Sequence, residues 1–301
     1  MHIFLVNRPD RMGANLSWYI MQLIYAHYNN YYVFYEKLEF EDSFFIQMIQ
    51  CYTEWYNQQL ESKGIEKGSR VDWVEPSQQD WPGNCMIVCK HIQSDLVSYF
   101  KTHFGNHMRA VMEALSLKLD ISSPAFNPEK TICVHLRLDD VIDRKDYDGR
   151  ISSSYYAEKL NSGHIGIDLG EERIHGLMNG VDVPGWGRYY NPYDCQAPID
   201  QDRLLPVIQT VQSKFPDHEV LVVASPIGKI TLPYKTLRSS NQDMDLYALC
   251  NCNVLICSRS SFSFCAVYLG RAKEIWVPMW GHIAATGLTS KYDNSHLNYF
   301  Y

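Results

Sequence analysis

Residues 245–269 constrain the fold of this chain more than any other segment. They read as a short helix, a buried strand at 253–257, a hydroxyl-rich turn and a second helix. The first turn of a helix that follows a strand offers unpaired N–H groups and the positive end of the helix dipole. This arrangement is typical of phosphate-binding sites.

The turn before the second helix contains four serines: Ser258, Ser260, Ser261 and Ser263. Their hydroxyl groups can donate to an anion, but serine is also a common residue at an ordinary helix N-cap. The turn alone therefore leaves both interpretations open.

A second segment, at 131–140, is an apolar strand that ends in His135, Arg137, Asp139 and Asp140. Ligands of open α/β sheets bind at the carboxyl ends of strands, so polar chemistry belongs at this position. The planar guanidinium of Arg137 suits a diphosphate. The alternative is a strand end whose arginine and aspartates pair on the surface.

The two segments together resemble the motifs of the α-1,2-/α-1,6-fucosyltransferase superfamily. The resemblance lies in His135-x-Arg137-x-x-Asp140, in Asp245 and in the turn Ser260-Ser261-Phe262-Ser263-Phe264. It implies an α/β fold of the GT-B type, with two Rossmann-like domains facing a central cleft, and GDP-fucose as the donor.

Other parts of the chain extend the resemblance. The loop Arg11-Met-Gly13-Ala-Asn15 is similar to the glycine-asparagine loop of the family, and Gln93-Ser94 with Tyr99-Phe100 is similar to two of its residue pairs. The resemblance implies that Asp245 binds guanine, whereas from the sequence alone Asp245 is a helix N-cap residue. The implied substrate-binding residues are Gly13, Asn15, His135, Arg137, Asp140, Asp245, Ser260, Ser261 and Phe262.

The chain departs from the family at Ser225-Pro226-Ile-Gly228, where acidic residues are usual. This departure leaves two alternatives to GDP-fucose open. One is the same fold with another nucleotide sugar, such as UDP-xylose or GDP-rhamnose. The other is a catalytically silent module that binds a nucleotide or a sugar.

The expected reaction is an inverting transfer of the sugar to a glycan hydroxyl. Arg137 would stabilise the departing diphosphate without a metal ion, so we expect no cofactor beyond the donor. A carboxylate must deprotonate the acceptor. The candidates are Asp140, Asp143 and Asp146, with Asp143 preferred, although charged runs of this kind are usually solvated loops.

The length of 301 residues, with 46% hydrophobic and 20% charged residues, suits two medium-sized domains. A proline-containing linker at 121–130 places the boundary after residue 128. Residues 1–128 would form the acceptor-side domain and residues 129–301 the nucleotide-sugar domain. An aromatic, turn-rich segment at 174–199 either borders the acceptor or packs as a surface loop.

The net charge of −7 and the lack of a basic block argue against nucleic acid as a partner. Nine cysteines, an odd number, predict free thiols in a reducing compartment, and their spacing does not match a zinc site. Residues 1–6 read as a first strand that is too short for a signal peptide or a membrane span. We therefore expect no membrane span. The enzymes that the chain resembles are often Golgi-anchored in animals, so the resemblance implies a cytoplasmic enzyme of bacterial or viral type, or a shortened chain.

The remaining pattern predicts helices at 16–28, 41–61, 95–119, 202–215 and 243–250, and strands at 31–35, 70–74, 85–89, 219–224 and 274–277. The tail, which ends in Tyr-Phe-Tyr, is expected to pack on the first domain.

Overall fold

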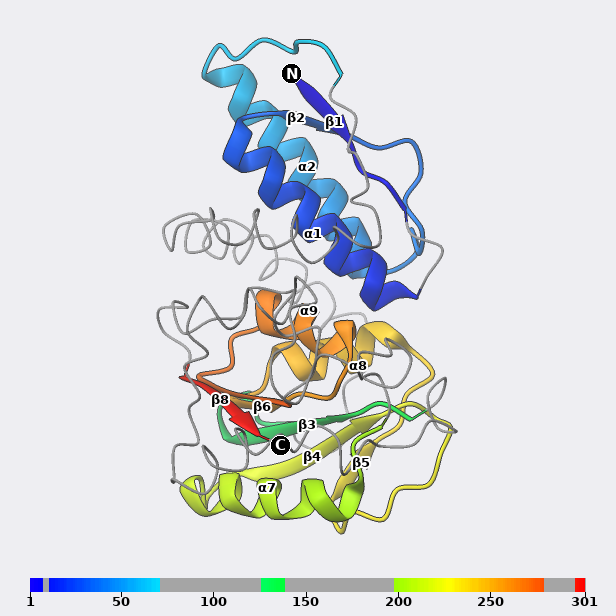
Figure 1. Ribbon diagram of the computed structural model, residues 1–301, viewed down its shortest axis with the longest axis vertical. Coiled ribbons are helices and arrows are strands. Elements are labelled where there is room, and N and C mark those ends of the chain that lie inside the picture. Colours follow the sequence, from blue (N-terminus) through cyan, green and yellow to red (C-terminus); the bar gives the residue numbers. More distant parts are fainter. Residues whose placement is uncertain (8–10, 71–125, 139–197, 279–295, 301) are drawn as a thin grey trace, which may run out of the picture. The chain divides into compact units, whose positions relative to one another are not determined.

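The computed structural model describes residues 1–7, 11–70, 126–138, 198–278 and 296–300. The chain divides into two compact units, Met1–Pro124 and Ala125–Tyr301 (Figure 1). The boundary expected from sequence, between 128 and 129, lies a few residues further along. The strand at 85–89, the helix at 95–119, the pair Gln93-Ser94 and all but the last two residues of the segment at 174–199 fall outside the described residues.

The first unit contains a parallel pair of strands, β1 (His2–Phe4) and β2 (Tyr32–Phe34). They are connected by the helix α1 (Met12–Asn29), and the helix α2 (Phe44–Ser62) follows. α1 ends where Asn30 adopts the left-handed conformation (φ 54°) and its N–H donates to the carbonyls of the last turn. α2 begins where the Ser43 side chain accepts a hydrogen bond from the N–H of Phe45.

The first helix starts earlier than the sequence analysis predicts. The segment from Arg11 to Asn15 is not a loop, because α1 begins at Met12 and includes Gly13 and Asn15. Met12 is buried, and the main-chain N–H and the side-chain Nδ2 of Asn15 both donate to the Arg11 carbonyl, at 3.0 and 3.3 Å. Burial and these two hydrogen bonds close the first turn at a position where sequence alone favours a loop.

The second unit is built on a six-stranded parallel sheet with the order β5-β4-β3-β6-β7-β8. The strands are β3 (Thr131–Leu136), β4 (Glu219–Ala224), β5 (Lys235–Leu237), β6 (Val254–Ile256), β7 (Glu274–Pro278) and β8 (His296–Phe300). Successive strands are added on one side of β3 and then, from β6 onward, on its other side. This is the doubly wound order, and it confirms the prediction of an α/β class.

Helices cover both faces of this sheet (Figure 1). α7 (Gln201–Lys214) lies on one face, and α8 (Gln242–Cys250) and α9 (Ser261–Leu269) lie on the other. Residues of β3 alternate between the two faces: Ile132, Val134 and Leu136 belong to the core that includes α7. Cys133 donates through Sγ to the carbonyl of Ala248 in α8. All six residues of β3 are buried, as expected for the central strand of a parallel sheet.

The C-terminal strand was not predicted from sequence. Residues His296–Phe300 form β8, which pairs in parallel with β7 from Glu274↔His296 to Pro278↔Phe300. β8 thereby pairs with main-chain N–H and C=O groups along the edge of β7, which an edge strand would leave unpaired. The sequence analysis also missed β5, which has only three residues.

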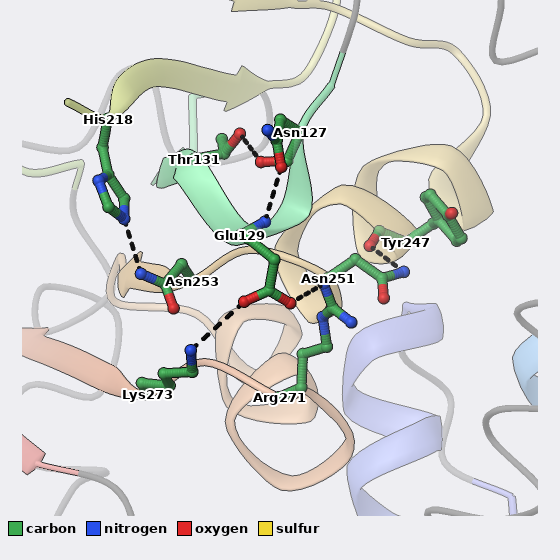
Figure 2. Close-up of polar contacts among 9 residues, drawn as sticks. All are labelled: Asn127, Glu129, Thr131, His218, Tyr247, Asn251, Asn253, Arg271 and Lys273. Atoms are coloured by element: carbon green, nitrogen blue, oxygen red, sulfur yellow. Dashed lines mark hydrogen bonds and ion pairs between the residues drawn. The ribbon is translucent and has the colours of Figure 1, made fainter.

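Side chains tie together the segments that precede the strands, at the amino edge of the sheet (Figure 2). Glu129, just before β3, accepts from Arg271 Nη2 at 2.9 Å and from Lys273 Nζ at 3.3 Å, both just before β7. Asn253 Nδ2 donates to Nε2 of His218 at 2.7 Å and so connects the start of β6 with the start of β4. The exposed ion pairs contribute little to stability.

The ends of α8 and α9 lie close together at Gly270. A Cβ atom at this position would lie 2.3 Å from the Ala266 carbonyl oxygen and 3.0 Å from that of Cys250. Glycine therefore allows the two helices on one face of the sheet to approach each other. Within the described ranges, no helix is long and apolar enough to cross a membrane.

Candidate functional site

The candidate site lies at the carboxyl ends of β3 and β6, where the strand order reverses. The two strands are paired through Val134↔Ile256, so the residues that follow them emerge side by side. Arg137 follows β3 directly, and the turn 257–260 connects β6 with α9. In doubly wound sheets this reversal point is where ligands bind.

A buried hydrogen-bond cluster joins the two strand ends. Nδ1 of His135 lies 2.5 Å from Oγ of Ser263 and 2.8 Å from Oγ of Ser258. The main-chain N–H of Ser258 also donates to Oγ of Ser263, at 3.1 Å. These contacts assign Nδ1 of His135 and two of the four serine hydroxyls to the protein interior.

The imidazole of His135 is neutral at physiological pH. Burial, and secondarily the nearby positive charge of Arg137, lower its pKa to about 3. His135 is therefore a neutral hydrogen-bonding group and not a proton carrier near pH 7.

Arg137 and Ser260 organise the N-terminus of α9. Nη1 of Arg137 donates to the Arg259 carbonyl at 3.3 Å, and Oγ of Ser260 accepts from the N–H of Phe262 at 3.2 Å. Ser260 is thus the N-cap of α9, and Ser261 is the first residue of the helix. The ring of Phe262 lies 5.6 Å from that of His135.

Arg259 is a candidate residue that the sequence analysis missed. It lies in the turn between β6 and α9 and is only 4% exposed. Arg137 contacts the main chain of this turn and Arg259 belongs to it, so two arginines lie next to a helix N-terminus, where the dipole also favours an anion. The sequence signal that could have identified this residue is an arginine within an otherwise serine-rich turn.

Asp245 lies in the first turn of α8 but does not cap it. The N-cap is Asn241, whose side chain accepts from the N–H of Asp243 at 2.9 Å, so the N-cap role expected for Asp245 is corrected. Asp245 is 9% exposed, and its Oδ1 has no hydrogen-bond partner in the part of the chain that the structure describes. Burial raises its pKa to about 7, against a smaller opposing effect of the Ser239 main-chain N–H.

The site residues expected from sequence are therefore only partly brought together. His135, Arg137, Ser260, Ser261 and Phe262 meet around one turn, and Asp245 belongs to α8, which packs against α9. Gly13 and Asn15 belong to the first unit, where Asn15 is fully buried. Asp140 and Asp143 lie outside the described residues.

The segment after β4, where the sequence departs from the fucosyltransferase pattern, is held by Arg238. Its guanidinium donates to the carbonyls of Ser225, Pro226 and Gly228 at 3.2, 2.6 and 2.7 Å. Gly228 has a φ of 95°, which favours glycine. β4 pairs with β3 up to Ala224↔Leu136, so this loop starts beside Arg137.

Two further observations concern other chemistry. In the described ranges, no three His, Cys, Asp or Glu side chains are placed to hold a metal ion, and the six cysteines there are free thiols.

No protein-family model matches the chain, and no curated protein sequence matches it significantly. The functional assignment therefore depends on the fold and on the chemistry of the site.

Proposed function

We propose that this chain is an inverting glycosyltransferase that moves a sugar, most simply L-fucose from GDP-fucose, to a glycan hydroxyl without a metal ion. In this proposal the chain has the GT-B arrangement, with the donor on residues 129–301 and the acceptor on residues 1–128. The observation that carries the proposal is the contact of His135 with the serine turn at the strand-order reversal.

The positive groups at this point suit a diphosphate leaving group. Arg137, Arg259 and the N-terminus of α9 all lie where β3 and β6 end. Charge develops on the diphosphate as the bond to the sugar breaks, and preorganised donors stabilise that charge. Neutral His135 would keep the turn in place without adding a charge that changes near pH 7.

Asp245 supports a guanine base. Guanine presents two N–H donors, N1–H and the 2-amino group, on one edge, and a carboxylate can accept both. Uracil presents one N–H between two carbonyl oxygens, and these oxygens would repel a carboxylate. Oδ1 of Asp245 is buried and lacks a partner among the described residues, so a guanine would relieve the cost of an ionised carboxylate there.

The base that deprotonates the acceptor is proposed to be Asp143, with Asp140 and Asp146 as the other candidates. All three follow the end of β3 within ten residues along the chain. This assignment comes from the sequence alone.

A second candidate function is transfer from another nucleotide sugar, such as UDP-xylose or GDP-rhamnose. The observation that favours it is the loop from Ser225 to Gly228, which carries no carboxylate and is held by Arg238 through its main chain. A silent binding module remains the third reading, and it differs from both enzymes in having no dependence of rate on Arg137.

The test is the release of GDP from GDP-fucose with a panel of glycan acceptors, in buffer that contains a chelator. Arg137→Ala should lower the rate at least about 100-fold, the effect of losing one charge-stabilising donor. Arg271→Ala, at the amino edge of the sheet and 49% exposed in its side chain, is the matched control and should leave the rate unchanged. Equal rates for Arg137→Ala and the wild type would overturn the proposal.

A further inference from the structure

Phe40, in the loop that follows β2, has an unusual combination of backbone conformation and exposure. Its φ is 61°, in the left-handed region, and the residue as a whole is 38% exposed. Bulky side chains are rare in that region because Cβ crowds the following carbonyl. Strained residues of this kind concentrate at binding sites.

The loop is held firmly on the side that leads to Phe40. The main-chain N–H of Glu39 donates to Oδ1 of Asn7 at 3.2 Å and to the hydroxyl of Tyr19 at 3.1 Å. Nδ2 of Asn7 donates to the carbonyl of Lys37 at 2.9 Å, and Leu38 is fully buried. The backbone before Phe40 is therefore fixed to the end of β1 and to α1.

The loop is also held on the side that leaves Phe40. The Phe40 carbonyl accepts from the N–H of Ser43 at 2.8 Å, and Gln47 Nε2 donates to the carbonyl of Glu41 at 3.2 Å. Both donors belong to the start of α2, since Ser43 is its N-cap. These contacts hold the backbone of Phe40 in its left-handed conformation.

The chemistry around the ring matches a sugar. The face of an aromatic ring carries partial negative charge and attracts the C–H groups on the apolar face of a pyranose. Glu39 and Glu41 are the exposed neighbours of Phe40 in the chain, and Oε1 of Glu41 pairs with Nζ of Lys37 at 3.4 Å. The remaining carboxylate oxygens can accept hydrogen bonds from sugar hydroxyls. The loop follows the carboxyl end of β2, the edge at which α/β sheets bind ligands.

We propose that Phe40, flanked by Glu39 and Glu41, is a platform on which a pyranose ring of the acceptor glycan stacks. The identification of this sugar as the acceptor rests on the proposed glycosyltransferase function. The stacking itself requires only the first unit.

The test uses three substitutions that separate the ring from the backbone strain. Phe40→Tyr keeps the aromatic face, Phe40→Leu keeps the strain but removes the face, and Phe40→Asn removes the face and tolerates positive φ. Ile227→Ala, at an exposed apolar residue of the second unit, is the control. Binding of methyl β-D-galactopyranoside, methyl β-D-N-acetylglucosaminide and methyl α-D-mannopyranoside to the intact protein is measured by NMR without nucleotide, and Tm is measured for every variant.

We expect at least one glycoside to bind the wild type, Phe40→Tyr and Ile227→Ala equally. Phe40→Leu and Phe40→Asn should weaken that binding about three- to tenfold, the size of one aromatic contact. Tm shows whether each variant is folded at the temperature of the binding measurement.

The proposal is overturned if no glycoside binds the wild type or if folded Phe40→Leu and Phe40→Asn bind as well as the wild type. Nucleotide binding is a separate measurement, so a protein that binds glycosides but no nucleotide contradicts the transferase function alone. A protein that binds GDP but no glycoside contradicts the platform alone.

Discussion

His135 and Ser263 connect the first strand of the second unit with the helix that follows β6. Nδ1 of His135, at the end of β3, lies 2.5 Å from Oγ of Ser263 in the first turn of α9. Both residues are buried, and Ser258 adds a second hydroxyl 2.8 Å from the same nitrogen. The hydrogen bonds hold the turn with Arg259 and Ser260 against the end of β3.

Because the hydroxyls of Ser258 and Ser263 share Nδ1 of His135, we predict that the effects of the two substitutions on the unfolding free energy are not additive. Ser258→Ala should cost about 1 kcal/mol of unfolding free energy, because the hydroxyl of Ser263 still satisfies Nδ1 of His135. Ser263→Ala should cost more, because the N–H of Ser258 also loses its acceptor. The double variant leaves Nδ1 buried without either hydroxyl and should cost more than the sum. Urea denaturation of the four proteins measures the coupling.

Ser213→Ala is the control for this cycle, because its hydroxyl donates to a single acceptor, the carbonyl of Thr210, and is exposed. It should change stability little. Additive effects of Ser258→Ala and Ser263→Ala would show that the two hydroxyls do not share His135.

The neutral state of His135 predicts a loss of stability in mild acid. Its folded-state pKa of about 3 lies below the ordinary value of 6.5, so between these values the unfolded chain binds the extra proton. The contribution of His135 to stability is complete above about pH 6.5 and is lost as the pH falls towards 3. The slope approaches about 1.4 kcal/mol per pH unit at most.

The measurement compares the unfolding free energy of the wild type and of His135→Asn between pH 7 and pH 4. Asparagine does not titrate, so the wild type should lose stability more steeply than the variant. Parallel curves would mean that His135 is already protonated or exposed in the folded protein.

Asp245 predicts the opposite dependence on pH. Its folded-state pKa of about 7 lies above the ordinary value of 3.8, so the folded protein holds the proton more tightly than the unfolded chain. Stability from this group is complete below about pH 3.8 and is lost as the pH rises through 7. At pH 8 the unliganded protein therefore carries a buried carboxylate charge.

Asp245→Asn should consequently raise the unfolding free energy at pH 8, by at least about 1 kcal/mol, and have a smaller effect at pH 5. Asp217→Asn, an exposed carboxylate just before β4, is the control and should show neither change. A variant less stable than the wild type at pH 8 would show that Asp245 makes a favourable structural contact.

The sequence predicts the elements around the site well because they are strongly patterned. The strands predicted within 131–140 and at 253–257 are built on apolar runs, and the helix predicted at 202–215 has a clear period. The structure has a strand at Thr131–Leu136, and it differs from the other two predictions by one residue at each end. The strand order could not be predicted, because it depends on contacts between distant segments. β8 was missed for that reason, since its pairing with β7 is what makes it a strand.

The site was predictable only in its residue types. His135 and the serines were expected to face a ligand, but Ser258 and Ser263 bond His135 instead, which depends on the register of β3 and β6. The first turn of α1 formed where a loop was expected because Met12 is buried. The strain at Phe40 leaves no mark in the sequence, since φ is a property of the folded loop.

The most direct test of the central claim is the thermal stabilisation of the intact protein by GDP and by UDP, in buffer with a chelator. A ligand at a hundred times its dissociation constant stabilises by about 2.7 kcal/mol. The proposal predicts that GDP raises Tm, that UDP does not, and that Asp245→Asn abolishes the effect of GDP. A shift with UDP alone, or no shift with either nucleotide, would contradict it.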